Sequence, residues 1–293
     1  MATPIIKWAG GKRQLLQAIK ETFGDIEIRN NRYYEPFFGG GALFFDLKPR
    51  KANLNDINKE LMNVYRVVRD NVDELIQELE ILKNNHSEEQ FYKIREIDRE
   101  VDFLQLGSIF RAARTIYLNK TCFNGLYRVN SKGYFNTPSG KYINPSLYDE
   151  LNLRNVSKLL SSKTINLTCK SYEESVKYAR KGAIIYFDPP YDYENEDGFV
   201  GYSKQGFNQE DLKRLKTVSD KLVDRGCIVL LSNNDTPYVR QLFEGDHRYH
   251  IEYVVRKIDS RRSINCNGKN RKNGKEVIIY GRKSFVPASE WFS

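Results

Sequence analysis

The chain contains the stretch Ala183-Ile184-Ile185-Tyr186-Phe187-Asp188-Pro189-Pro190-Tyr191, and this stretch decides the fold class. Its first five residues are apolar and rich in β-branched and aromatic types, a pattern typical of a buried strand. Asp188 is therefore expected at the carboxyl end of a strand, the edge where open α/β sheets bind their ligands. The two prolines fix φ and remove two N–H donors, so the turn offers carbonyl oxygens.

The residue types of this turn favour, as its ligand, a flat base that carries an exocyclic amino group. The Asp188 carboxylate and a proline carbonyl can accept the two protons of that group, while Tyr191 stacks on the ring. Taken alone, the motif fits an ordinary strand-ending turn with an exposed acid equally well. The rest of the chain has to decide between the two.

A second strand and turn precede it in the chain. Tyr33–Phe38 is expected to be a strand, and Gly39, Gly40 and Gly41 form a turn before an apolar helix over 42–45. A short strand over 52–55 then ends at Asp56. A glycine turn followed by an acid one βα unit later is the general arrangement of a nucleotide site. The pattern is not G-x-G-x-x-G, which disfavours a dinucleotide and favours a nucleoside with a short zwitterionic arm, such as S-adenosylmethionine.

Further strands are expected at 164–168, 183–187, 227–231 and 277–280. Between them, residues 57–106 carry helical stripes, such as Leu61, Val64, Tyr65 and Val68, that indicate core packing without a functional role. The strand ends near Ser171, at Asp188 and at Ser232 should share one edge of the sheet. The chain is thus predicted to be an α/β protein with a long helical insertion.

Charge indicates a polyanionic partner. The 47 basic and 38 acidic residues leave a net charge of +9, which by itself is weak support. No acidic residue occurs over 103–148, although six basic and several aromatic residues do. This block is typical of a surface that contacts phosphates and stacks on bases. A basic segment over 256–275 is predicted to be a loop that orders on DNA, with a disordered linker as the alternative.

Cysteine and histidine placement points to a reduced compartment and no metal. The four cysteines are scattered, which favours a cytoplasmic protein. No signal peptide or membrane-spanning stretch is expected. His247 and His250 are more readily surface residues than a metal pair.

Five motifs in order resemble the DNA adenine methylase family over nearly the whole chain. They are the segments 7–12 (KWAGGK), 35–41 (EPFFGGG), 124–128 (NGLYR), 188–191 (DPPY) and 231–233 (LSN). The resemblance implies a Rossmann-like, S-adenosylmethionine-dependent methyltransferase sheet over 1–56 and 165–293, with a helical target-recognition insertion over 57–164. It implies methyl transfer to the N6 amino group of an adenine flipped out of duplex DNA, within the site GATC.

The resemblance also assigns roles to residues. The catalytic residues would be Asp188, Pro189, Pro190 and Tyr191. The cofactor would contact Trp8, Gly10, Lys12, Phe38, Gly39, Gly40, Gly41, Asp56, Ser171, Tyr172 and Asp188. DNA would contact Lys7, Asn124, Leu126, Arg128, Pro138, Lys141, Tyr142, Arg261 and Arg262. Within these sets Leu126 resembles an intercalating residue, Arg128 and Lys7 resemble residues that recognise bases, and Lys141 a phosphate contact.

Alternatives stay open at this point. The acidic strand end would also serve methylation of cytosine N4 or of RNA, and a relative that binds nucleic acid without catalysis would keep the same fold. Cytosine C5 chemistry is disfavoured because no cysteine follows a proline. Phosphoryl transfer is disfavoured because the chain has no Walker motif. A monomer is expected, and a restriction endonuclease is a possible functional partner.

Overall fold

The computed structural model describes residues 1–8, 15–24, 27–190, 207–244, 251–260 and 274–283. These residues form two compact units, each of which is described by itself. The first comprises 1–11, 38–46 and 55–170, and the second comprises 12–37, 47–54 and 171–293. The strands form a mixed sheet of seven in the order β3-β2-β1-β4-β5-β7-β6. The prediction of an α/β fold is confirmed.

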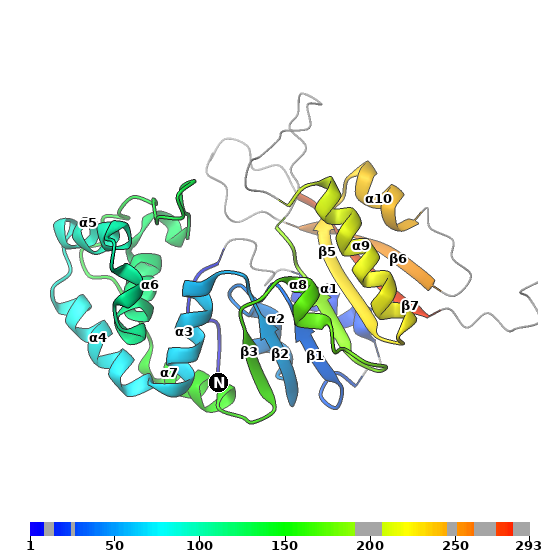
Figure 1. The fold of residues 1–293 in the computed structure, drawn as a ribbon, viewed down its shortest axis with the longest axis horizontal. Coiled ribbons are helices and arrows are strands. Elements are labelled where there is room, and N and C mark those ends of the chain that lie inside the picture. Colours follow the sequence, from blue (N-terminus) through cyan, green and yellow to red (C-terminus); the bar gives the residue numbers. More distant parts are fainter. Residues whose placement is uncertain (9–14, 25–26, 191–206, 245–250, 261–273, 284–293) are drawn as a thin grey trace, which may run out of the picture. The chain divides into compact units, whose positions relative to one another are not determined.

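The second unit holds most of the sheet (Figure 1). Its elements are α1 (Leu16–Phe23), β1 (Arg32–Glu35), β2 (Lys51–Asn55), α8 (Tyr172–Val176), β4 (Ile184–Phe187), α9 (Gln209–Asp224), β5 (Ile228–Asn234), α10 (Pro237–Glu244), β6 (Ile251–Ser260) and β7 (Gly274–Lys283). β1 pairs in parallel with β2 and β4, and β4 in parallel with β5. β7 is antiparallel to both β5 and β6. The carboxyl ends of β2, β1, β4 and β5 therefore lie at one edge.

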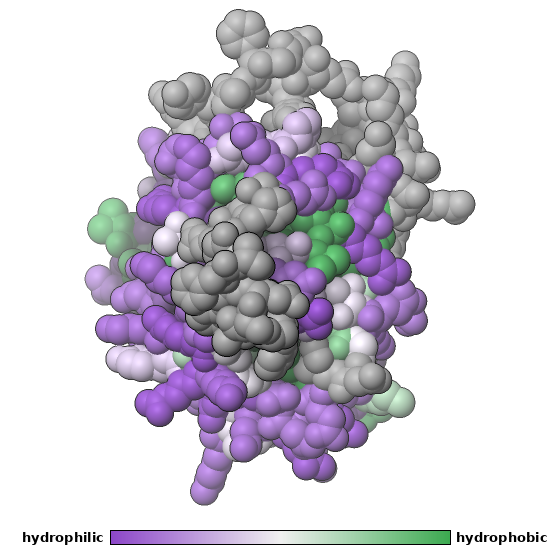
Figure 2. Space-filling view, turned by 90° about the vertical axis from the view of Figure 1, so that its right-hand side faces the viewer, coloured by the Kyte–Doolittle hydropathy of each residue, from purple (hydrophilic) through white to green (hydrophobic). Residues whose placement is uncertain are grey.

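β4 is buried on both faces because helices and neighbouring strands cover it. All four of its residues are buried, as the apolar run predicted. On one face Ile185 and Phe187 join Val229 and Leu231 of β5 in a core closed by apolar residues of α9 and α10. The outer surface of the face seen in Figure 2 is mostly hydrophilic. Apolar side chains of this unit are thus used mainly inside, between the sheet and its helices.

Several strands differ from the prediction. β1 ends at Glu35 although a strand was expected as far as Phe38, and β7 is longer than the expected 277–280. β5 continues to Asn234 because Ser232, Asn233 and Asn234 pair with β7, whereas the apolar run ended at Leu231. β6 was not predicted, and the prediction of a loop over 256–275 is wrong for 256–260 and 274–275, which belong to β6 and β7. Charged residues such as Glu252 and Arg256 interrupt its apolar residues, since it pairs with β7 alone at the end of the strand order. An edge strand needs no continuous apolar run.

The first unit is mainly helical. It contains α2 (Ala42–Leu47, shared at its last residue), α3 (Lys59–Asp70), α4 (Val72–Asn84), α5 (Glu88–Glu96), the short helices η1 (Ile97–Arg99), η2 (Phe103–Gln105) and η3 (Phe123–Gly125), α6 (Ser108–Thr121), α7 (Glu150–Leu160) and β3 (Ile165–Thr168). α6 is buried along most of its length and packs against α3, α4 and α5. The stripe Leu61, Val64, Tyr65 and Val68 is fully buried, which confirms it as core.

Candidate functional site

The Asp188 carboxylate is held by a chain of hydroxyl groups at the ends of β4 and β5. Phe187 pairs with Leu231, so Asp188 and Ser232 follow side by side. Ser232 Oγ donates to Asp188 Oδ1 at 2.7 Å, and Tyr186 Oη lies 3.1 Å from Ser232 Oγ. Because the serine proton is used on the carboxylate, the tyrosine hydroxyl is the donor to the serine oxygen. The expected meeting of Asp188 and Ser232 at one edge is confirmed.

Burial keeps this chain of donors protonated. Tyr186 is buried, and both this burial and the nearby Asp188 charge raise the pKa of its hydroxyl well above the ordinary value. Tyr33 is buried beneath the same sheet edge and donates to Glu35 Oε2 at 2.8 Å. Its pKa is also raised well above the ordinary value, first by burial and then by Glu35. Neither phenol can ionise near neutral pH, so both remain hydrogen-bond donors.

The structure describes the two prolines of the D-P-P-Y motif but not its tyrosine. Pro189 is buried and Pro190 is exposed directly after β4. Tyr191 lies outside the described residues, as do Gly10, Lys12, Arg261 and Arg262. For those five positions the predicted roles remain predictions.

The glycine turn of the first unit is closed against Trp8. Gly39 has φ +49°, and a Cβ there would lie 2.7 Å from Trp8 Cδ1. A Cβ on Gly40 would lie 3.2 Å from Trp8 Cβ. The indole in turn stacks on Tyr127 with ring centroids 4.9 Å apart. Only glycine permits this approach, so the turn and the amino-terminal motif form one packed layer within that unit.

Asp56 is anchored to this turn by backbone donors. Its Oδ2 accepts from the Gly39 N–H at 2.9 Å, and its Oδ1 accepts from the Asn58 N–H at 2.9 Å. Burial raises the pKa of the carboxyl group, and the bonds from Asn58, Gly39 and Ile57 oppose that rise. Each oxygen has a second lone-pair direction. The carboxylate is therefore fixed in orientation while it can still accept bonds from hydroxyl groups.

Phe38 lies inside the first unit. It is buried, its ring lies 4.7 Å from that of Tyr65, and the Tyr65 hydroxyl donates to the Gly39 carbonyl at 3.0 Å. A Cβ on Gly41, at φ +68°, would lie 2.6 Å from the Phe38 ring. These contacts set the shape of the glycine turn from beneath.

Ser171 and Tyr172 lie in the second unit at the start of α8. Ser171 Oγ accepts from the Glu174 N–H at 3.2 Å and so caps the helix. The Tyr172 ring stacks on Phe37 with centroids 5.4 Å apart. Phe37 follows β1 by two residues, which places an aromatic pair beside the carboxyl end of that strand.

The predicted DNA contacts gather on the loop 122–142 of the first unit. Bonds across the loop close it: Phe123 N–H to the Pro138 carbonyl at 2.9 Å, and Gly140 N–H to the Thr121 carbonyl at 2.8 Å. The buried Thr137 hydroxyl donates to the Leu126 carbonyl at 2.6 Å. The exposed positions on this loop include Phe123, Asn124, Arg128, Pro138, Lys141 and Tyr142. Phe123, 54% exposed, was not singled out from the sequence, although it precedes the N-G-L-Y-R motif directly.

Contacts within the protein orient two of the side chains that are predicted to bind DNA. Arg128 Nε donates to Asn136 Oδ1 at 2.8 Å, which aligns its guanidinium along the loop. The aliphatic stem of Lys7 lies over Gly125, where a Cβ would come within 2.4 Å of Lys7 Cδ. The buried amide of Asn119 bonds the backbone of Lys7, a role that no pattern in the sequence indicated.

Part of the acid-free block is structural rather than free to bind phosphates. Arg111 lies 3.3 Å from Glu60, and Arg114, which is 3% exposed, lies 3.0 Å from Asp98. Both acids come from outside 103–148, so the fold supplies the missing negative charge. The expectation that the whole block meets phosphates is wrong for these two arginines. For the loop 122–142 the expectation stays a prediction.

Among the described residues, no group of three or more histidines, cysteines, aspartates or glutamates is arranged to hold a metal ion. The described cysteines, Cys122, Cys169 and Cys227, are free thiols.

In the described part of the chain, no helix has the length and apolar character needed to span a membrane.

Comparison with known proteins gives consistent results. The family model of the D12 class N6 adenine-specific DNA methyltransferases matches residues 8–257. The chain is 38% identical to Type II methyltransferase M1.LlaDCHI of Lactococcus lactis subsp. cremoris, over 94% of either chain. It is 40% identical to Type II methyltransferase M.MjaIII of Methanocaldococcus jannaschii, over 92% of this chain and 96% of that protein. It is 32% identical to the DNA adenine methylase of Escherichia coli K12, over 96% of both. The chain therefore belongs to the family of D12 class N6 adenine-specific DNA methyltransferases.

Proposed function

We propose that this chain transfers the methyl group of S-adenosylmethionine to the N6 atom of an adenine flipped out of duplex DNA within GATC. The observation that carries the proposal is the bond from Ser232 Oγ to Asp188 Oδ1 at 2.7 Å. It fixes a carboxylate at the carboxyl end of two parallel strands, where α/β sheets bind ligands. Membership of the adenine-specific family supports the choice of base.

Asp188 and Pro189 act on the amino group of the target. The adenine N6 lone pair is delocalised into the ring, which makes the nitrogen a poor nucleophile. By accepting hydrogen bonds from its two N–H groups, the Asp188 carboxylate and the Pro189 carbonyl favour a pyramidal nitrogen whose lone pair is directed out of the ring plane. The proton that N6 loses when it gains the methyl group leaves along the bond to Asp188. Tyr186 and Ser232 prevent rotation of the carboxylate during the reaction. Most of the rate enhancement then comes from holding the amino group and the methyl donor in a reactive geometry.

The residues of the first unit suit the cofactor. Asp56 can accept bonds from ribose hydroxyls with the lone pairs that Gly39 and Asn58 leave open. The glycine turn lets a ligand approach its backbone because no Cβ stands in the way. When bound, the sulfonium supplies an activated methyl group to a nucleophile in line with it. The predicted contacts at Gly10, Lys12, Ser171 and Tyr172 belong to the same proposal.

The loop 122–142 recognises DNA in this proposal. Leu126 fills the gap left by the flipped base, since a target inside a duplex is inaccessible. Lys7 and Arg128 contact guanines, which present paired acceptors in the major groove. Lys141 contacts a phosphate, and Asn124, Pro138, Tyr142, Arg261 and Arg262 complete the surface. Residues 57–164 would form the recognition insertion, with 1–56 and 165–293 as the catalytic domain.

The proposed target is a palindrome, which a monomer can methylate one strand at a time. We propose a monomer for that reason. Two relatives bear the name Type II methyltransferase, and this supports a restriction endonuclease as functional partner.

The test measures tritium transfer from labelled S-adenosylmethionine to a GATC duplex and to a duplex of scrambled sequence, followed by nucleoside analysis. We expect label in N6-methyladenine with GATC alone. Label in adenine of both duplexes would reject the site and keep the chemistry. Label in N4-methylcytosine would reject the base assignment.

Asp188→Asn is the matching variant. It keeps the shape of the side chain and should lower kcat about 100- to 10 000-fold, the range for a positioned proton acceptor. Binding of the GATC duplex should stay within about twofold. A kcat close to that of the wild-type protein would contradict the role given to Asp188.

A further inference from the structure

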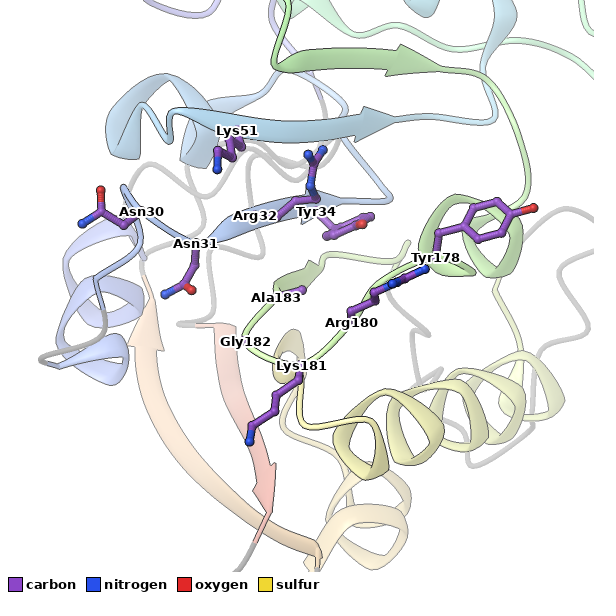
Figure 3. Close-up of a pocket in the computed structure, with 10 residues that line it drawn as sticks. All are labelled: Asn30, Asn31, Arg32, Tyr34, Lys51, Tyr178, Arg180, Lys181, Gly182 and Ala183. Carbon is purple, nitrogen blue, oxygen red and sulfur yellow. The ribbon is translucent and has the colours of Figure 1, made fainter.

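A basic hollow lies at the edge of the sheet opposite Asp188. It has a volume of about 320 Å³ and belongs to the second unit alone. Arg32 and Lys51 are the first residues of β1 and β2, and Ala183 directly precedes β4. The hollow therefore opens at the amino-terminal ends of these parallel strands (Figure 3). Its lining is Asn30, Asn31, Arg32, Tyr34, Lys51, Tyr178, Arg180, Lys181, Gly182 and Ala183.

The cations of the hollow form no ion pair with a described acidic residue, although the Glu27 carboxylate accepts a bond from the lining amide of Asn30. Four of its ten lining residues are Arg or Lys, and none is Asp or Glu. In the described parts of the chain, the charged ends of Arg32, Lys51, Arg180 and Lys181 take part in no hydrogen bond or ion pair.

Several arginines elsewhere, although not all of them, are paired with a carboxylate. Arg114 is paired with Asp98, Arg154 with Asp73, and Arg240 with Asp235. Like charges gathered without a counter-charge repel one another and destabilise the folded state. An anion that bound in the hollow would relieve that repulsion.

Tyr34 supplies an uncharged hydrogen-bond donor beside these cations. The residue is 5% exposed, lies in the core between sheet and helices, and lines the hollow. Within the residues that the structure describes, its hydroxyl makes no hydrogen bond. Burial raises the pKa of this phenol, while the charges of Arg32 and Arg180 act in the opposite direction. The hydroxyl is therefore a protonated donor under the influence of two guanidinium groups. The hydroxyl is not among the buried polar atoms that lack a partner, so it is accessible from the hollow and can donate to an oxyanion bound there.

We propose that Tyr34, Arg32 and Arg180 form a binding site for a phosphate group, separate from the methyl-transfer site. A phosphate offers several charged oxygens, so it can accept from a phenol and from two guanidiniums that approach from different sides. The volume exceeds what one phosphate needs. The group can therefore belong either to a free phosphorylated small molecule or to the backbone of a nucleic acid.

Two variants of the full-length protein separate the parts of the site. Tyr34→Phe removes only the hydroxyl and preserves the core packing. Arg32→Gln with Arg180→Gln removes two charges. The matched control is Lys93→Gln with Lys158→Gln, because both lysines are exposed on helices of the first unit and their loss changes the net charge equally.

Sodium pyrophosphate is the first probe, with affinity measured by calorimetry at low salt. We expect Tyr34→Phe to bind about tenfold more weakly than the wild-type protein, the loss of a bond to a charged group. The double arginine variant should bind more weakly still, and the control should match the wild-type protein. This result identifies a free phosphorylated ligand as the source.

The second probe is a 40-base-pair duplex lacking GATC, with affinity measured across a salt series. If the source is a nucleic-acid backbone, pyrophosphate binds none of the proteins. The slope of log affinity against log salt then falls by about two for the double arginine variant and not for the control. If both variants match the control with both probes, the proposal is overturned.

Discussion

The side chain of Asn119 bonds both backbone groups of Lys7. Its Oδ1 accepts from the Lys7 N–H at 2.8 Å, and its Nδ2 donates to the Lys7 carbonyl at 2.7 Å. The same Nδ2 donates to the Gly125 carbonyl at 3.1 Å. Asn119 is fully buried on α6, so one amide fixes the amino-terminal segment and the loop 122–142 to the same helix.

Asn119→Ala should therefore relax recognition through Lys7. We expect discrimination against a GATC site altered at one guanine to fall about 5- to 100-fold, in line with the worth of a base contact. The measurement is kcat/KM on the cognate and altered duplexes, with and without Lys7→Met. If Asn119 acts through Lys7, its substitution changes discrimination little in the Lys7→Met background. Independent, additive effects on discrimination would contradict this positioning role.

Gly125→Ala and Gly133→Ala form a matched pair for the same contact. Both glycines have positive φ, +67° and +84°, so alanine is strained at each by about 1 kcal/mol. A Cβ at Gly125 would also displace Lys7, while nothing lies within 4 Å of one at Gly133. We expect both variants to lose stability in urea unfolding, and Gly125→Ala to lose more because its Cβ also meets Lys7 and the Asn119 carbonyl. Only Gly125→Ala should lose site discrimination. If both variants lost site discrimination equally, loop strain and not the Lys7 contact would determine the discrimination.

Ser232→Ala should weaken catalysis without weakening DNA binding. Removal of the donor frees the Asp188 carboxylate to rotate, and a bond to a charged group corresponds to about 10- to 100-fold in kcat. The measurement is single-turnover methyl transfer at saturating cofactor and DNA. Ser219→Ala is the control, because Ser219 is also fully buried in the second unit and donates to the Leu215 carbonyl instead. A kcat of Ser232→Ala equal to that of the control would refute the orienting role.

Arg128 and Lys141 should differ in how their loss depends on DNA sequence. Arg128→Ala should cost about 1–3 kcal/mol at one base position and leave binding to unrelated duplexes little changed. Lys141→Ala should weaken binding to all duplexes alike and reduce the salt slope by about one. Fluorescence anisotropy across a salt series, on cognate and single-substituted sites, measures both. If Arg128→Ala weakened binding to all duplexes and Lys141→Ala weakened it at one base position, the two roles would have to be exchanged.

The sequence predicted the parts of this fold in which one local pattern determines the structure. The run 184–187 is buried on both faces and could be recognised as a strand without knowledge of its neighbours. β6 could not, since its pattern depends on its place at the end of the sheet. Asp188 was evident from its motif. Ser232 was expected at the same edge, but its bond to Asp188 depends on the pairing of Phe187 with Leu231.

Tertiary pairing accounts for the remaining differences. Arg114 belongs to a block without acidic residues, yet it meets Asp98, which is distant enough in sequence to escape a local count of charge. Asn119 looks like an ordinary polar residue in a helix, and its function arises only when three chain segments meet around it. A local sequence pattern does not show which distant segments will contact one another in the folded protein.

The stability of the protein should fall at alkaline pH because of two buried thiols. Burial raises the pKa of Cys122 and of Cys227 to about 11 each, above the value of about 8.5 expected in the unfolded chain. Between these values the unfolded state binds fewer protons than the folded state, so the free energy of unfolding decreases as pH rises. The stabilising contribution is complete below about pH 8.5 and is lost through pH 11.

Urea unfolding at pH 8 and at pH 10 measures the decrease, which should amount to about 1–2 kcal/mol per thiol. The double variant Cys122→Ala with Cys227→Ala should be less stable at pH 8 but should show a shallower decrease. A decrease of the same size in that variant would assign the pH dependence to other groups, such as Tyr117, whose pKa burial raises to about 12.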